Sequence, residues 1–123
     1  MDRAAPIATF AQFWPFYVSQ HRRSGTRVLH FAGTTVGLLC FARAIAASQP
    51  FFLLWGLVGS YGLAWIGHFF IEKNRPATFQ YPLWSLLGDF KMYGLMWTGR
   101  MGAELKRLNL ATNDAQVETS RSG

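Results

Sequence analysis

The sequence predicts an all-α integral membrane protein whose centre is a helical hairpin. Half of the 123 residues are hydrophobic and only 15% are charged, whereas a soluble domain usually carries about 25% charged residues. Two apolar stretches, residues 28–48 and 51–71, each reach the length of about 20 residues that a helix needs to cross a bilayer. We therefore expect one membrane-embedded helical domain over residues 1–108.

An N-terminal amphipathic helix should precede the hairpin. Phe10, Phe13, Trp14 and Tyr17 recur at helical spacing. This pattern is typical of a helix that lies on a membrane surface with its aromatic side in lipid. The alternative is an ordinary helix whose aromatic side is buried against other parts of the protein.

The two apolar stretches should pack as antiparallel neighbours, because only residues 48–50 connect them. Helices in lipid associate through small residues that let their backbones approach closely. Glycines of this kind occur on both stretches, and whether they also support a homo-oligomer stays open. They are Gly33, Gly37, Gly56, Gly59 and Gly62.

Positive charge predicts the orientation of the hairpin. Arg22, Arg23 and Arg27 precede the first stretch, Lys73 and Arg75 follow the second, and the connection between the stretches is nearly uncharged. By the positive-inside rule, both ends of the hairpin, and with them both termini, should face the cytoplasm. The net charge of +6 then indicates anionic lipid headgroups as partners, and the chain has no nucleic-acid-binding motif.

A further helix is expected over residues 83–108, with Pro82 at its start. Its apolar part, residues 83–97, is short for a span and contains Asp89 and Lys91. We therefore expect a helix docked at the cytoplasmic interface, with a third membrane span as the alternative. Residues 109–123 are polar and should form a disordered tail.

All three histidines of the chain should gather at the cytoplasmic rim of the hairpin. His30 begins the first span, His68 ends the second, and His21 lies just before the first. On one straight helix His21 and His30 would face opposite sides, so the chain must turn between them. A break at residues 24–26, with Thr26 capping the next helix, would supply that turn.

Three converging imidazoles predict a metal site, because imidazole suits iron, copper and zinc. The alternative is three structural histidines joined by hydrogen bonds. Open non-haem Fe(II) sites commonly combine two histidines with a carboxylate. Glu72, one helical turn after His68, is therefore a candidate for a replacement or extra ligand, and Asp89 for a supporting residue.

Together these residues resemble a family of small membrane proteins typified by an Fe(II)-dependent 2-hydroxy fatty acid dioxygenase. The resemblance covers roughly residues 13–100. This chain has Arg22-Arg23-Ser24-Gly25 where eukaryotic members commonly carry Asn-Pro, and it lacks their additional membrane segments, so it is similar to compact bacterial members. The motifs that carry the resemblance are Phe16-Tyr17, His21, His30, Gly67-His68, Glu72-Lys73, Arg75-Pro76-Ala77 and Ser85-Leu86.

The resemblance implies an enzyme of the bacterial inner membrane that uses Fe(II) and O2 to shorten 2-hydroxy fatty acids by one carbon, in fatty acid α-oxidation. The metal ligands would be His21, His30 and His68. Glu72 would act beside the metal, and Lys73 or Arg75 would hold the substrate carboxylate. The alternative for these two cations is anchoring at the lipid headgroups. The competing function is a non-catalytic membrane scaffold or lipid-binding protein.

Overall fold

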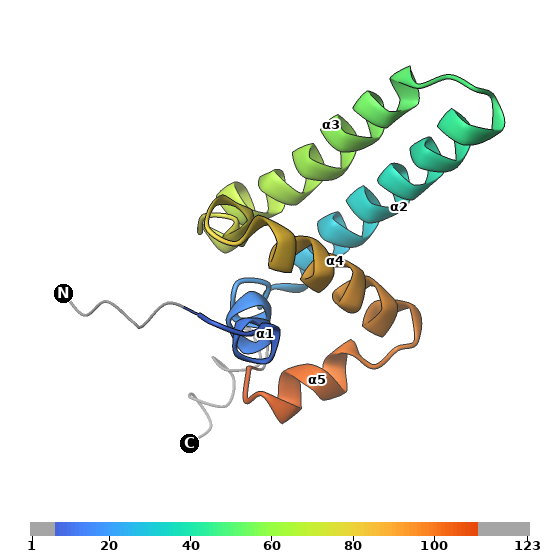
Figure 1. The fold of residues 1–123 in the computed structure, drawn as a ribbon. Coiled ribbons are helices and arrows are strands. Elements are labelled where there is room, and N and C mark those ends of the chain that lie inside the picture. The colour runs from blue at the N-terminus through green and yellow to red at the C-terminus, as the bar shows by residue number, and fades with distance from the viewer. Residues whose placement is uncertain (1–6, 111–123) are drawn as a thin grey trace.

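The structure of the protein, a computed structural model, describes residues 7–110 and consists of helices joined by short connections (Figure 1). This confirms the predicted all-α fold. Residues 111–123 of the predicted tail lie outside the described part. The elements are α1 (Phe10–Ser19), α2 (Ser24–Ala46), α3 (Phe51–Ile66), the π-helical turn η1 (Gly67–Glu72), the 3-10 turn η2 (Ala77–Phe79), α4 (Pro82–Trp97) and α5 (Met101–Arg107).

Helices α2 and α3 form the predicted antiparallel hairpin, which projects away from the other helices (Figure 1). The segments Ser24–Ala46 and Phe51–Glu72 are long and apolar enough to span a membrane. Only 17% and 22% of the residues in their most apolar stretches are buried within the protein. An exposed apolar surface of this extent is unfavourable in water, so the hairpin fits membrane association.

Glycine allows the two hairpin helices to touch through their backbones. A Cβ atom on Gly33 would lie 2.7 Å from the carbonyl oxygen of Ser60, and one on Gly59 would lie 2.8 Å from Val36 Cγ1. Real Cβ atoms do not approach other atoms so closely, so these positions accept only glycine without movement. The predicted packing is confirmed there, but Gly62 faces open space and takes no part in it.

Helix α4 crosses the open end of the hairpin, and α1 and α5 pack beneath it (Figure 1). The aromatic side of α1 faces this protein core, where Phe13, Trp14 and Tyr17 are buried. The interpretation of these residues as facing lipid is therefore wrong. An amphipathic pattern shows that one side of a helix is apolar, and it does not show whether lipid or protein covers that side.

Helices α1, α4 and α5 are held together by close packing and by one carboxylate. A Cβ on Gly88 of α4 would lie 2.9 Å from the Tyr17 ring, so α1 lies directly against the α4 backbone. The Trp14 indole donates a hydrogen bond of 2.6 Å to Glu104 on α5. Arg107 also donates to Glu104, through two nitrogens. These hydrogen bonds, those from Arg107 first, lower the pKa of Glu104 to about 2.

The C-terminal helix predicted over residues 83–108 is interrupted. Pro82 begins α4 as expected, but α4 ends at Trp97, and Gly99 adopts the left-handed backbone conformation with φ at +69°. Glycine adopts this conformation without steric cost, and the chain therefore turns before α5 starts. The turn brings α5 back against α1, so that Met101 and Leu105 enter the core.

Replacement of Gly33 by alanine should destabilise the hairpin, because the new methyl group would collide with the Ser60 backbone. We expect Gly33→Ala to lower the free energy of unfolding in detergent micelles by about 1–3 kcal/mol. Gly62→Ala is the matched control, since open space surrounds Gly62. It should change stability little or raise it by up to about 1 kcal/mol. Equal losses in both variants would contradict glycine-mediated packing.

Candidate metal centre

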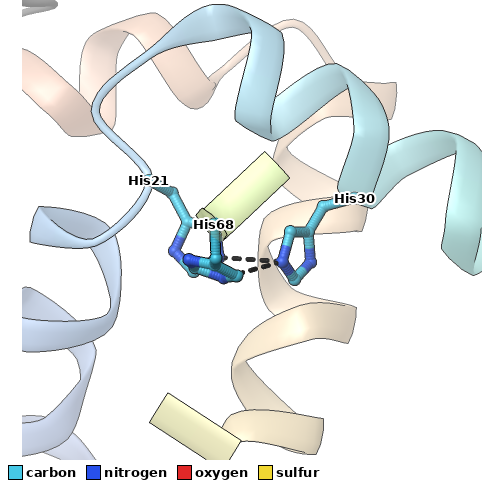
Figure 2. Close-up of side chains that lie close together, drawn as sticks. All are labelled: His21, His30 and His68. Carbon is cyan, nitrogen blue, oxygen red and sulfur yellow. Dashed lines mark hydrogen bonds between the residues drawn. The ribbon is translucent and has the colours of Figure 1, made fainter. Parts of the chain in front are cut away.

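The three histidines converge on one buried point, as the sequence predicted (Figure 2). His21 lies in the connection between α1 and α2, His30 lies on α2, and His68 lies on η1. The Nε2 atom of His30 is 3.1 Å from the Nε2 atoms of both other rings. One ligand atom from each ring lies within 4.8 Å of the others. Each residue is at most 7% exposed.

The turn that brings His21 to His30 lies earlier than predicted. Helix α2 already begins at Ser24, so Thr26 is a buried residue within the helix and does not cap it. The guanidinium of Arg27 stabilises the turn, since one of its nitrogens donates 2.7 Å hydrogen bonds to the carbonyl oxygens of His21 and Arg22. His21 is therefore positioned by the buried guanidinium of Arg27 on the following helix, and Thr26 has no capping role.

A π-helical turn positions His68. Such turns contain one residue more than an α-helical turn and are frequent at functional sites. Its first residue, Gly67, lies close to α2, where a Cβ would be 3.2 Å from the Thr26 methyl group. After the turn, Lys73 adopts the left-handed conformation with φ at 64°. The backbone N–H of Asn74 then returns to donate to the His68 carbonyl at 2.9 Å.

The Nδ1 atom of each histidine faces an oxygen. The His21 Nδ1 atom lies 2.7 Å from the Tyr17 carbonyl, and His68 Nδ1 lies 2.7 Å from Asn74 Oδ1. The Asn74 amide is oriented by its other end, which donates to the Gln20 carbonyl. His30 Nδ1 lies 3.5 Å from Asp89 Oδ1.

These contacts determine the tautomers of at least two rings. Carbonyl oxygens only accept hydrogen bonds, so the Nδ1 atoms of His21 and His68 must carry the hydrogen. Their Nε2 atoms then present bare lone pairs toward the Nε2 atom of His30. A hydrogen on that atom could point at only one neighbour at a time. Hydrogen bonding within the trio therefore cannot satisfy the lone pairs of His21 and His68 at the same time.

A cation would satisfy the lone pairs of His21 and His68 together with that of His30, whose hydrogen can lie on the Nδ1 atom that faces Asp89. Nitrogen ligands at about 2.0–2.1 Å from a tetrahedral or octahedral ion lie roughly 2.9–3.4 Å apart, and the separations of 3.1 Å at His30 fall in this range. Oxygen acceptors on the opposite ring nitrogens are the usual support of histidine ligands. Two of the three separations therefore fit a shared metal ion, and the third is at most 4.8 Å.

Burial controls the protonation of the residues around the trio. Burial, with the neighbouring His30 and His68, holds the pKa of His21 well below its ordinary value, so His21 is neutral and able to bind metal at neutral pH. Burial has the opposite effect on an acid and raises the pKa of Asp89 to about 7, although the hydrogen bond from Tyr17 opposes this rise. Tyr17 also stacks on the His21 ring, with centroids 4.2 Å apart.

An apolar cavity of about 530 Å³ leads from the histidines along the hairpin. Its lining on α2 extends from His30 to Phe41, a distance of roughly 16 Å at 1.5 Å per residue. One leaflet of a bilayer, which an acyl chain fills, is about half of a 30 Å hydrocarbon core. The cavity thus combines a polar end with an apolar channel as long as an acyl chain.

Comparison with known proteins agrees with this geometry. The family described as 2-hydroxy-palmitic acid dioxygenase Mpo1-like matches residues 7–101 of the 123-residue chain. The chain belongs to the Mpo1-like family. No curated protein and no solved structure gives a significant match. The match confirms the family suggested by the motifs. The matched residues include all three histidines.

Three further residues that the family motifs suggested are not among the groups that converge in this Mpo1-like chain. The Glu72 carboxylate accepts a hydrogen bond from the backbone N–H of Arg23, at the start of α2. Lys73 and Arg75 are exposed, and neither lines the cavity. The Arg75 guanidinium lies over the Phe79 ring, 5.8 Å from its centroid. Glu72 is therefore engaged at a helix N-terminus, where negative charge is favourable.

Sequence reasoning missed three residues that orient the histidines of this Mpo1-like site. The sequence pattern predicts Tyr17 to be a lipid-facing aromatic residue and Arg27 to be a topology signal, and it predicts no role for Asn74. Asn74 follows His68 by six residues, a spacing that fits no regular helix face. Only the π-helical turn and the left-handed Lys73 bring its side chain beside the histidine.

Removal of the Asn74 side chain should weaken metal binding, because His68 would lose the acceptor that fixes its tautomer. We expect Asn74→Ala to lower the metal affinity about 10–100-fold, as measured by competition with a chelator. Asn109→Ala makes the same truncation at an exposed position outside the site and should leave the affinity unchanged. An unchanged affinity in Asn74→Ala would show that the ring is held by other contacts.

Proposed function

We propose that this protein is a membrane-bound dioxygenase that shortens 2-hydroxy fatty acids by one carbon, with Fe(II) held by His21, His30 and His68. The observation that carries the proposal is the convergence of three imidazole nitrogens at the polar end of an acyl-length cavity. Membership of the Mpo1-like family supports the substrate class. When bound, Fe(II) supplies the one-electron chemistry that allows an organic acid to react with O2.

The residues of the cavity support an amphiphilic substrate. Leu38, Phe41 and Leu57 line the channel and are also exposed on the hairpin surface. An acyl chain can therefore enter from the side, directly from the lipid, without passing through water. The acid head then lies at the histidine end, where Asp89 and Tyr17 form a hydrogen-bonded pair next to His30.

The chain itself contributes orientation and exclusion of water. Tyr17 Oη donates to Asp89, and this carboxylate faces His30 Nδ1, which orients the ring. Leu86 and Phe90 on α4 line the cavity with apolar side chains that disfavour water there. The overall reaction balances when one O2 converts the hydroxyl-bearing carbon into the carboxyl group of the shorter acid. The original carboxyl group leaves as CO2, and one water forms.

A non-catalytic scaffold or lipid-binding protein remains the competing function, because an apolar cavity also suits a lipid that undergoes no reaction. In that case the trio would be structural. The tautomers favour the enzyme, since Tyr17 and Asn74 hold the hydrogens of His21 and His68 on the Nδ1 atoms. Structural histidines would not need the bare lone pairs of His21 and His68 to face the same nitrogen of His30.

Metal content and turnover test the proposed function together. Anaerobically purified protein should contain about one iron per chain and should release the shortened acid and CO2 with consumption of O2. His68→Ala should lose both properties, because it removes a ligand. Glu72→Gln and Arg75→Ala should retain iron, since both side chains lie outside the trio. Iron-free wild-type protein after reconstitution, or iron without oxidation of the acid, would favour the scaffold.

We further propose that the hairpin lies in a bacterial inner membrane with both termini in the cytoplasm. Arg23, Lys73 and Arg75 are exposed at the same end of the hairpin, so they can anchor that end at anionic headgroups. This placement favours anchoring over a role in binding the substrate carboxylate. The histidine trio would then lie near the cytoplasmic side.

Tags should report this orientation directly. A reporter fused to either end of the chain should be active in the cytoplasm, whereas one inserted at residues 48–50 should be exposed on the opposite side, because these residues join the two spans. Protease protection of inside-out vesicles provides the independent measurement. A C-terminal reporter on the opposite side would show that α4 crosses the membrane and would contradict the orientation.

A further inference from the structure

Ser85 has a buried hydroxyl group without a hydrogen-bond partner among residues 7–110. The residue lies in the first turn of α4, is 2% exposed and lines the cavity. Serine hydroxyls within helices often donate to a carbonyl of the preceding turn, but Ser85 Oγ makes no such bond. An unsatisfied buried hydroxyl is unfavourable, and in a native protein it suggests an absent partner. Gln20 Oε1 is also unpartnered, but Gln20 does not line the cavity.

Among residues 7–110, no cationic side chain lines the polar end of the cavity, where it could bind a carboxylate. None of the residues that line it is a lysine or an arginine. The Tyr17 hydroxyl already donates to Asp89, and Ser60 Oγ donates to a carbonyl of its own helix. Among the hydroxyl groups of the cavity lining in residues 7–110, which also include those of Thr34, Tyr61 and Thr78, only Ser85 Oγ is buried without a hydrogen-bond partner. A carboxylic acid in this cavity therefore needs a neutral donor in addition to any metal ion.

Ser85 is placed to be that donor. It precedes Asp89 by one helical turn, and residues with this spacing lie on the same face of a helix. Asp89 Oδ1 in turn lies 3.5 Å from His30 Nδ1. The Ser85 hydroxyl therefore belongs to the histidine end of the cavity, beyond which the lining becomes apolar.

We propose that Ser85 Oγ donates a hydrogen bond to the substrate carboxylate and so positions the acid head beside the histidine trio. This inference rests on the proposed function. Ser85 takes part in no bond-making step. Its hydroxyl distinguishes a carboxylate head from an alcohol head of similar size, because a hydrogen bond to a charged acceptor is stronger than one to a neutral acceptor.

Equilibrium binding of three probes tests the proposal. The probes are 2-hydroxypalmitic acid, palmitic acid and 1,2-hexadecanediol, competed against a labelled acid on the iron-loaded protein under anaerobic conditions, which prevent turnover. Ser85→Ala should weaken both acids by roughly 10-fold to 100-fold, as expected for loss of a hydrogen bond to a charged group. The diol, which has no carboxylate, should bind the variant and the wild type within about twofold.

Thermal unfolding without ligand separates this role from a structural one. Ser85→Ala should unfold at the same temperature as the wild type or a higher one, because it removes an unsatisfied buried hydroxyl. Ser19→Ala is the matched control, since Ser19 Oγ donates to the Phe16 carbonyl and lies outside the cavity. It should unfold at an equal or lower temperature and bind all three probes like the wild type.

Several outcomes would overturn the inference. Unchanged affinity of Ser85→Ala for both acids would show that Ser85 does not contact the carboxylate. If the wild-type protein still binds and turns over the hydroxy acid, the proposed function stands in that case. An equal loss of affinity for the hydroxy acid and the diol in Ser85→Ala, with palmitic acid unaffected, would show that Ser85 Oγ contacts the substrate's 2-hydroxyl group instead of its carboxylate. A wild-type protein that binds none of the acids would contradict the proposed function and this inference together.

Discussion

The convergence of three imidazole nitrogens on one buried point is the constraint on which the rest of the structure depends. His21 and His68 present unprotonated nitrogens to His30 because a carbonyl and an amide oxygen hold their hydrogens on the opposite ring atoms. Without a cation this arrangement is electrostatically unfavourable, since like partial charges face one another in a buried space. The surrounding fold must therefore supply enough rigidity to maintain it.

That rigidity comes from two different kinds of packing. In the hairpin, glycines bring the α2 and α3 backbones into contact, which fixes the distance between His30 and His68. Beneath the hairpin, buried aromatic residues of α1 pack on α4 and α5, which fixes Tyr17 and with it the ring of His21. The histidine trio lies where these two packed units meet. The hairpin can thus have lipid as its solvent while the centre remains enclosed by protein.

The sequence predicted the position of the histidines but not the means by which they are held. An antiparallel hairpin necessarily places the start of its first helix beside the end of its second, so His30 and His68 had to meet. His21 needs only a turn in the chain to reach the other two histidines. Arg27 stabilises that turn, and Thr26 does not cap the helix that follows it. Asn74 could not be found by periodicity, because a π-helical turn changes the register of the residues that follow. The spacing of the aromatic residues predicts an apolar side of α1, but it does not identify whether lipid or protein covers that side.

The order of the histidines along the chain has a consequence for biosynthesis. His21 and His30 leave the ribosome before the second hairpin helix exists, and His68 emerges only after that helix is complete. A metal ion that requires all three nitrogens cannot bind tightly to the nascent chain. It can bind only after both helices have been inserted and paired, and a ligand that binds only the folded form stabilises that form. With the proposed metal site, metal loading would act as a checkpoint for correct membrane insertion, and a chain with an inverted or unpaired helix would remain metal-free and open to degradation.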